Sequence, residues 1–176
     1  MSDIVWAINP DRDHLGDLIQ RMRRFASDIL SATGIEFEFN APSVEDDVSF
    51  GANLRREAFL TFKESLNNIV KHSGAAHVLI DLEYSGGFIV LAIVDNGSGF
   101  DTADITPQLY SEQSGGNGIF NMRKRAAEMG GDISIASVPG RGTTVRLTLP
   151  LEGPRDAEKL EAIQKGGDET ARNGQN

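Results

Sequence analysis

The residues best suited to chemistry lie at 95–100, Asp-Asn-Gly-Ser-Gly-Phe, directly after the apolar run 88–94. Seven apolar, β-prone residues in succession predict a buried strand that ends at Asp95. Gly97 and Gly99 leave the following turn without bulky side chains and let a flat group approach the backbone. A buried carboxylate beside that opening could accept a hydrogen bond from an amino group, such as the exocyclic amine of adenine. A tight turn in which Asp95 accepts hydrogen bonds from local N–H groups explains the same residues, so both interpretations stay open.

A second group of polar side chains lies on the helix predicted over 54–72. The apolar stripe of this helix consists of Ala58, Phe62, Leu66 and Ile69. Glu64, Asn68 and Lys71 fall within about a 60° arc on the opposite side of the helix. Their carboxylate and amide oxygens suit a hard cation such as Mg²⁺, and the ammonium group suits a phosphate. Glu64 could also act as a general base, whereas a solvated helix face would show the same pattern without any chemistry.

Two glycine-rich turns could also contact a ligand. Residues 115–118, Gly-Gly-Asn-Gly, precede a helix predicted over 119–129, where free N–H groups and the helix dipole favour a phosphate. A flexible hinge would use the same glycines, and neither the P-loop pattern nor the dinucleotide-binding pattern is present. Residues 140–143, Gly-Arg-Gly-Thr, form a predicted hairpin turn that could bring the Thr143 hydroxyl beside Asp95. An ordinary glycine hairpin is the alternative there.

The elements that must hold these groups follow from periodicity. Helical spacing predicts helices over about 13–32, 54–72 and 119–129. Alternating or continuous apolar residues predict strands over 35–39, 78–84, 88–94, 133–135 and 143–149, the second and third of them joined as an antiparallel hairpin. Residues 101–117 have no periodicity, which is typical of a functional or mobile segment. Three helices on one face of a mixed, mostly antiparallel sheet give an α+β fold, a two-layer α/β sandwich.

Composition and charge exclude several classes of protein. The chain has 176 residues, enough for one domain, with 26 acidic and 17 basic residues. The net charge of −9 argues against binding to nucleic acid or to an anionic membrane. There is no cysteine, and the three histidines lack metal-ligand spacing, which disfavours a transition-metal site. No apolar run approaches the ~20 residues of a transmembrane helix.

Taken in order, the motifs resemble the ATP-binding domain of the superfamily that contains gyrase, Hsp90, histidine kinases and MutL (GHKL). The matching residues are Glu64, Asn68, Lys71 and His72, then Asp95, Gly97 and Gly99, then Gly116 and Gly118, then Gly142 and Thr143. Residues 118–126 and 140–150 resemble the sensor histidine kinases that include the nitrate sensors and the desaturase thermosensor. Residues 2–10 are similar to the segment that joins the dimerisation helices to the ATPase domain in β-propeller sensor kinases.

The resemblance divides the chain into three parts. Residues 1–12 would be a linker from a dimerisation domain, and residues 13–150 would be the histidine-kinase-like ATPase domain with the Bergerat fold. Residues 151–176 hold few large apolar side chains and are expected to form a disordered tail.

The resemblance also implies roles for the residues at the base-binding end of the site. Asp95 would accept a hydrogen bond from the adenine amino group. Gly97 and Gly99 would let the base pack against the backbone, and Thr143 would lie beside the adenine.

At the phosphate end, the resemblance implies metal binding, phosphate contact and closure. Asn68 would bind Mg²⁺, and Lys71 and His72 would lie near the phosphates or the ribose. Gly116 and Gly118 would shape a lid over the triphosphate. Glu64 occupies the position of the general base in ATP-hydrolysing relatives, and in the kinases this position is a candidate for activating the acceptor histidine.

The activity that the resemblance implies is transfer of the γ-phosphoryl of ATP, with Mg²⁺, to a histidine on a separate dimerisation domain. That domain and a response regulator receiver domain would be the partners, in the cytoplasm, with the parent protein anchored in a membrane. His14 follows the 2–10 segment and lacks the pattern around an acceptor histidine, so it is not expected to be the acceptor. Two alternatives are a serine/threonine kinase of the anti-sigma type and a nucleotide-sensing module without transfer activity.

Overall fold

The computed structural model describes residues 14–43, 51–102 and 117–151. Its helices are α2 (Leu15–Ser31), α3 (Ala52–Asn68) and α4 (Asn117–Glu128), and a five-residue π-helix, η2 (Ile69–Ser73), continues α3. Its strands are β1 (Glu36–Asn40), β2 (His77–Ser85), β3 (Phe88–Asp95), β4 (Asp132–Ser137) and β5 (Thr143–Pro150). The predicted linker over 1–12, most of the irregular segment 101–117 and almost all of the predicted tail lie outside the described residues.

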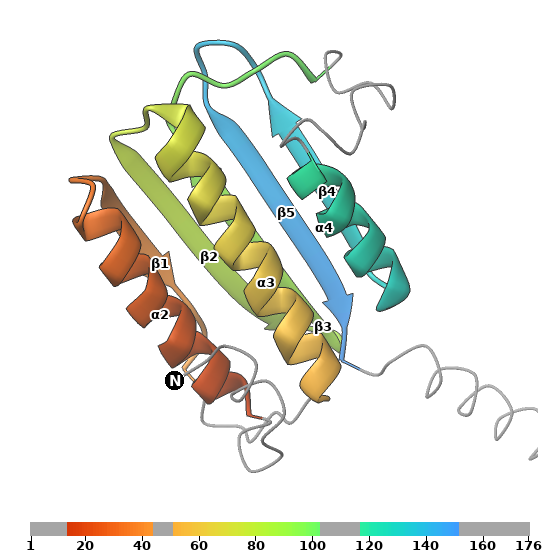
Figure 1. The fold of residues 1–176 in the computed structure, drawn as a ribbon. Helices are drawn as coiled ribbons and strands as arrows, with labels where there is room; N and C mark the ends of the chain where they lie inside the picture. Colours follow the sequence, from red (N-terminus) through yellow and green to blue (C-terminus); the bar gives the residue numbers. More distant parts are fainter. Residues whose placement is uncertain (1–13, 44–50, 103–116, 152–176) are drawn as a thin grey trace, which may run out of the picture.

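The strands form one mixed sheet in the order β1-β2-β3-β5-β4. Only the pairing of β1 with β2 is parallel, and the other three pairings are antiparallel. The three described α-helices lie side by side on one face of this sheet (Figure 1). This arrangement confirms the two-layer α/β sandwich that the sequence predicts.

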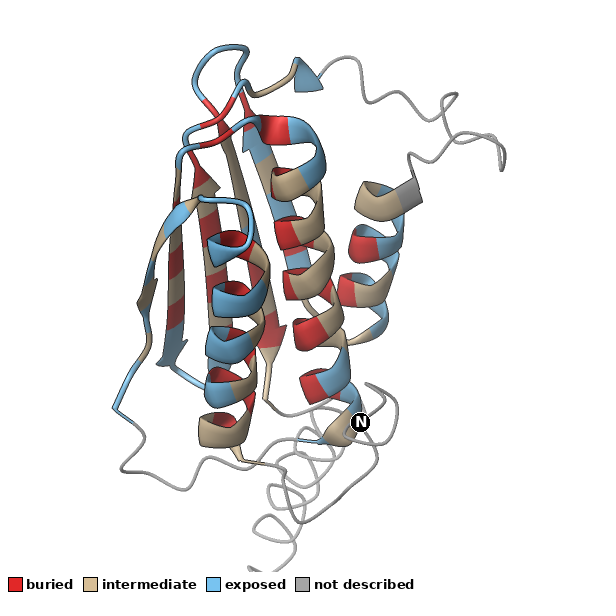
Figure 2. Ribbon diagram, turned by 60° about the vertical axis from the view of Figure 1, so that its left-hand side comes forward, coloured by how far each residue is buried: buried red, intermediate tan, exposed pale blue. Residues whose placement is uncertain are grey.

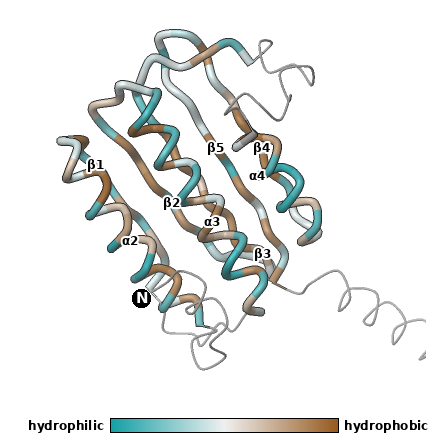
Figure 3. The backbone as a smooth tube through the Cα atoms, viewed as in Figure 1, coloured by the Kyte–Doolittle hydropathy of each residue, from teal (hydrophilic) through white to brown (hydrophobic). Residues whose placement is uncertain are grey.

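The core lies between the two layers and follows from the two periodicities. Along α2, buried residues recur every three or four positions: Leu15, Leu18, Met22, Ala26 and Leu30. On the strands, every second residue of β2 and β3 is buried, namely Val78, Ile80, Leu82, Ile89, Leu91 and Ile93. Figure 2 shows the buried side of each helix turned toward the sheet, and Figure 3 shows hydrophobic residues along the same strands. Helix and strand therefore bury their apolar residues against each other.

The turn between β2 and β3 confirms the predicted antiparallel hairpin. Gly86 and Gly87 connect the strands with φ angles of 59° and 80°. Two-residue hairpin turns of this kind require positive φ at both positions, which glycine adopts without a steric penalty. The N–H of Leu151, just beyond β5, donates to the carbonyl of Gly87 at 2.8 Å. Among the described residues, no helix has the length and apolar character that crossing a membrane requires.

Four chain segments meet at one end of the sandwich. The end of α3 with η2, the end of β3, the turn between β4 and β5, and the beginning of α4 all lie there (Figure 1). These are the segments that carry the polar residues singled out in the sequence. The fold therefore brings together residues that are far apart in the chain.

Candidate functional site

A cavity of about 320 Å³ opens at this end, between the helical layer and the sheet. Most of its wall is apolar and comes from four elements and η2: Ile69, Ile93, Ile119, Met122, Ile135 and Val145. A few polar side chains also line it: Glu64, Ser65, Asn68, His72, Ser73, Asp95, Ser98 and Thr143. An apolar cavity with a small set of placed polar groups is typical of a small-molecule binding site.

Asp95 is the most deeply buried carboxylate of this cavity. It is the last residue of β3, its exposed fraction is 4%, and its Oδ1 accepts a hydrogen bond from the N–H of Gly97 at 2.8 Å. Burial removes water from the ionised form and raises the pKa of Asp95, while hydrogen bonds from the backbone of Gly97 and Thr143 oppose that rise. The carboxyl therefore takes part in the local turn, as one interpretation of the sequence has it. It also lines the cavity, and its hydrogen bond with a ligand amino group stays a prediction.

The glycines after Asp95 are needed for close packing within the protein itself. A Cβ on Gly97 would lie 2.5 Å from the carbonyl oxygen of Ser73. The adjacent Ser98 N–H donates to that same carbonyl at 2.7 Å. Gly99, which lines the cavity, has a φ of 59°, and a Cβ there would overlap the carbonyl of Val138. The loop after β3 is thus held against η2 on one side and against the β4–β5 turn on the other.

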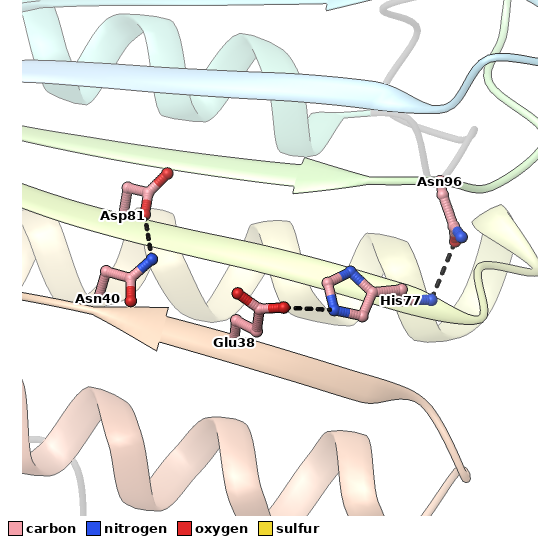
Figure 4. Close-up of polar contacts among 5 residues, drawn as sticks. All are labelled: Glu38, Asn40, His77, Asp81 and Asn96. Carbon is pink, nitrogen blue, oxygen red and sulfur yellow. Dashed lines mark hydrogen bonds and ion pairs between the residues drawn. The ribbon is translucent and has the colours of Figure 1, made fainter.

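Asn96 fixes the start of this loop from the side that faces away from the cavity. Its Oδ1 accepts hydrogen bonds from the N–H groups of Ala76 and His77, at 3.0 and 2.9 Å. Figure 4 shows Asn96 beside His77, whose ring forms an ion pair with Glu38 of β1 at 3.5 Å when the imidazole is protonated. These contacts connect the loop to β2, while the neighbouring Asp95 and Ser98 line the cavity.

Glu64 and Asn68 line the opposite wall of the cavity, one helical turn apart on α3. Ser65 and Ile69, which follow each of them, are buried and also line the cavity. The pair therefore borders the buried side of the helix instead of lying opposite it, as the predicted 60° arc implied. Both residues line the same cavity as Asp95.

The π-helical turn η2 changes which residues follow Asn68 along this wall. A π-helix has more residues per turn than an α-helix, so spacing extrapolated at 100° per residue fails beyond Asn68. Lys71 and His72 are both exposed, but His72 and Ser73 line the cavity and Lys71 does not. Lys71 therefore does not line the cavity beside Glu64 and Asn68, and its contact with a phosphate stays a prediction.

The first turn of α4 closes the side of the cavity next to Glu64. Gly118 lines the cavity, and a Cβ there would overlap Oε1 of Glu64. Glycine at this position thus lets the beginning of α4 approach the carboxylate, and negative charge near a helix N-terminus is favourable. Gly116 lies outside the described residues.

Sequence reasoning missed Ser65, Met122, Ile135 and Ser137 as contributors to the site. Met122 and Ile135 occupy the apolar faces of α4 and β4, where the pattern signals core without distinguishing a cavity wall. Ser137 is buried at the end of β4 and contacts two other segments, which a linear pattern does not reveal. Among the described residues, no group of three or more His, Cys, Asp or Glu side chains could hold a metal ion alone.

The chain is similar to known proteins of one ATPase family. Residues 54–153 match the family described as histidine kinase-, DNA gyrase B-, and HSP90-like ATPases. A sensor-like histidine kinase of Chloroflexus aurantiacus is 32% identical over 108 residues, which cover 61% of this chain and 18% of that protein. The sensor histidine kinase LiaS of Bacillus subtilis is 29% identical over 105 residues, which cover 60% of this chain and 27% of that protein.

Solved structures support the same fold. The histidine kinase domain of the blue-light activated histidine kinase from Erythrobacter litoralis EL346 superimposes with a TM-score of 0.61 at 21% sequence identity. The superposition covers 76% of this chain and 65% of that one. The chain spans about a quarter or less of the length of the two curated relatives. It belongs to the histidine kinase-, DNA gyrase B-, and HSP90-like ATPase family.

Proposed function

We propose that this domain binds ATP and Mg²⁺ in the cavity and delivers the γ-phosphoryl group to a histidine on the dimerisation domain of a longer sensor kinase. The observation that carries the proposal is the buried Asp95 carboxylate, which faces an apolar cavity whose opposite wall presents Glu64 and Asn68. An apolar space with an acceptor at its inner end suits a base that carries an amino group. Oxygen and imidazole groups on the opposite wall suit a charged triphosphate and its cation.

At the base-binding end, the side chains supply shape and one strong acceptor. Ile93, Ile135 and Val145 offer flat apolar surfaces on which a purine ring can be buried. The ionised carboxylate of Asp95 accepts a hydrogen bond from the amino group of adenine, and Thr143 lies opposite Asp95 on the neighbouring strand. Gly97 and Gly99 keep the loop thin enough for the base to approach the backbone.

At the phosphate end, the residues present fit a hard cation. Glu64 and Asn68 present carboxylate and amide oxygens from successive turns of one helix, the ligand type that Mg²⁺ prefers. We assign Asn68 as the metal ligand and Glu64 as the general base, or as the group that activates the acceptor histidine. When bound, Mg²⁺ would neutralise phosphate charge.

The remaining cationic and glycine residues complete the phosphate end of the proposal. His72 contacts the ribose or the phosphates from within the cavity, while the exposed Lys71 reaches the phosphates from solvent. Gly118, with Gly116, shapes the lid over the triphosphate. Phosphoryl transfer depends on positioning and charge stabilisation more than on covalent catalysis. These residues supply groups of both types.

The partners follow from this activity. We propose a histidine-bearing dimerisation domain of the same parent protein and a response regulator receiver domain, in the cytoplasm, with a parent anchored in the membrane. We also propose that the chain is related to the nitrate-sensor and desaturase-thermosensor kinases, which residues 118–126 and 140–150 resemble, and to β-propeller sensors, which residues 2–10 resemble. The two curated relatives are described as sensor histidine kinases, which does not favour the serine/threonine kinase or the sensing module without transfer activity.

A labelling experiment tests the proposal directly. The chain is incubated with γ-labelled ATP, Mg²⁺ and a separately produced dimerisation domain that carries its own histidine. Label that is lost in acid and kept in alkali identifies phosphohistidine, which is the expected product. Acid-stable label on a serine-bearing partner would instead establish the anti-sigma type of kinase. ATP binding in calorimetry with no label on any partner would establish a sensing module.

A further inference from the structure

The Ser137 hydroxyl lies where three segments of the site meet. Ser137 is 9% exposed and is the last residue of β4. Its Oγ accepts a hydrogen bond from the Phe100 N–H at 2.9 Å, lies 3.0 Å from the Gly142 carbonyl oxygen, and lies 2.9 Å from Oγ1 of Thr143. It therefore contacts the loop after β3, the β4–β5 turn and a residue that lines the cavity.

The number of hydrogens on these groups fixes the direction of each bond. A serine hydroxyl has one donor hydrogen and two acceptor lone pairs. A carbonyl oxygen only accepts hydrogen bonds, so the Ser137 hydroxyl donates its one hydrogen to the Gly142 carbonyl oxygen. The contact with Thr143 is then satisfied only if Thr143 donates to Ser137. With the Phe100 N–H as the second donor, the Ser137 hydroxyl makes its full set of one donated and two accepted bonds.

This direction determines what Thr143 shows to the cavity. Its single hydrogen is used toward Ser137, so only lone pairs of Oγ1 remain on the cavity side. Thr143 also stands directly opposite Asp95 in the β3–β5 register, and an ionised carboxylate only accepts. The side chains of Asp95 and Thr143 therefore present an edge of acceptors alone to the cavity. A base edge that carries an amino group matches it, whereas an oxo group would face lone pairs.

We propose that Ser137 is a positioning residue that holds the Thr143 hydroxyl as an acceptor and thereby selects 6-aminopurine over 6-oxopurine nucleotides. The inference rests on the proposed ATP-binding function and adds to it the residue that sets the choice of base. Ser137 acts through Thr143, without contacting the base.

The test compares binding of ATP with binding of ITP, which differs by an oxo group in place of the amino group, using calorimetry. The wild-type chain is expected to prefer ATP. Ser137→Ala frees the Thr143 hydrogen to turn toward the cavity, so the ATP-to-ITP preference should fall about five- to tenfold. Equal loss of affinity for both nucleotides would show that Ser137 only stabilises the loop, and it would overturn the proposal. Ser134→Ala, at an exposed serine of the same strand, is the matched control and should leave the preference unchanged.

A double-mutant cycle tests whether the effect passes through Thr143. Thr143→Val should lower the preference by itself, and adding Ser137→Ala should then change it by less than about twofold. A full further loss in the Thr143→Val background would overturn the proposal, as would a Thr143→Val variant with wild-type preference. Ser137→Cys keeps the volume with a weak acceptor, and it carries the same test if Ser137→Ala fails to fold. Failure of the wild-type chain to bind either nucleotide would instead refute the proposed function itself.

Discussion

At the scale of single residues, Asp95 combines two demands that a sequence shows separately. Its carboxyl accepts the Gly97 N–H and so stabilises the turn, yet it is buried at the wall of a cavity. Burial raises its pKa, which means that the protein holds this charge at a cost. A ligand that donates a hydrogen bond to the carboxylate offsets part of that cost.

Replacing Asp95 by Asn should therefore weaken ATP binding by more than tenfold. The amide presents donor hydrogens where the ligand also donates, and a mismatched buried hydrogen bond costs about 1.5–3 kcal/mol. Calorimetry of folded Asp95→Asn, with folding checked by circular dichroism, measures the loss. Asp132→Asn, at an exposed aspartate of β4, is the control and should bind ATP as the wild type does. Wild-type affinity in Asp95→Asn would remove this residue from the site.

The raised pKa of Asp95 also gives ATP binding a pH dependence. Ligand binding needs the ionised form, so affinity should fall as the pH drops through a pKa that lies above the ordinary value of 3.8. The contribution of this group to folding has the opposite sign, because the folded state binds the proton more tightly and gains stability on acidification. Calorimetry of ATP binding at decreasing pH should show the fall in the wild type and its absence in Asp95→Asn. An identical pH profile in both proteins would contradict the assignment.

Ser137 marks the limit of sequence reasoning at this scale. Asp95 and Gly99, which line the cavity, could be predicted because a charged and a flexible residue stand out after an apolar run. The role of Ser137 depends on Phe100 and Gly142, which come from two other segments. A serine at a strand end is common, so nothing in its neighbourhood along the chain distinguishes it.

At the scale of elements, the π-helical turn η2 decides which side chains reach the cavity. The predicted helix over 54–72 is correct in type and nearly so in extent, and its polar residues Glu64 and Asn68 do line the cavity. Spacing alone could not predict η2, because its apolar residues fit an α-helix equally well. The consequence is that His72 lines the cavity and Lys71 does not.

This geometry predicts unequal effects for two neighbouring substitutions. His72→Ala should lower ATP affinity several-fold, because it removes a side chain from the cavity wall. Lys71→Ala should lower it by about twofold or less at physiological salt, because an exposed charge is screened. Titrations at low and high salt would test the comparison, since the effect of Lys71 should grow at low salt. A larger loss for Lys71→Ala at every salt concentration would contradict the arrangement.

The loop after β3 predicts a stability effect that is separate from ligand binding. Gly97→Ala would place a Cβ 2.5 Å from the Ser73 carbonyl oxygen, and both partners are backbone-fixed. Overpacking of this kind costs about 1–3 kcal/mol of unfolding free energy. Gly51→Ala is the control, because no atom lies within 4 Å of a Cβ there. Equal denaturant midpoints for the two variants would show that the loop yields without cost.

At the scale of the whole molecule, the site exists because the two layers meet at one end. The sequence predicts the sandwich well, since helical and strand periodicities are strong and the hairpin at Gly86 and Gly87 has a defined turn chemistry. The parallel pairing of β1 with β2 and the strand order do not follow from any local pattern, because register and neighbours are set by packing. The cavity itself is a product of that packing.

Because the proposed metal ligand and the proposed base acceptor lie on different walls of the cavity, a substitution on one wall should affect metal binding and base binding unequally. Asn68→Ala removes an oxygen from the phosphate wall and leaves the base-binding end untouched, since Asp95 lies on the sheet and Asn68 on α3. Phosphoryl transfer to a supplied histidine-bearing dimerisation domain should therefore fall at least about a hundredfold, while ATP affinity falls less than about tenfold.

The measurement pairs the labelling assay with calorimetry, each at several Mg²⁺ concentrations. Because lost metal affinity is offset by mass action, high Mg²⁺ should restore part of the transfer in Asn68→Ala and none in Asp95→Asn. Parallel loss of transfer and of ATP affinity, unaffected by Mg²⁺, would assign Asn68 to nucleotide binding and leave the metal without a ligand on this wall.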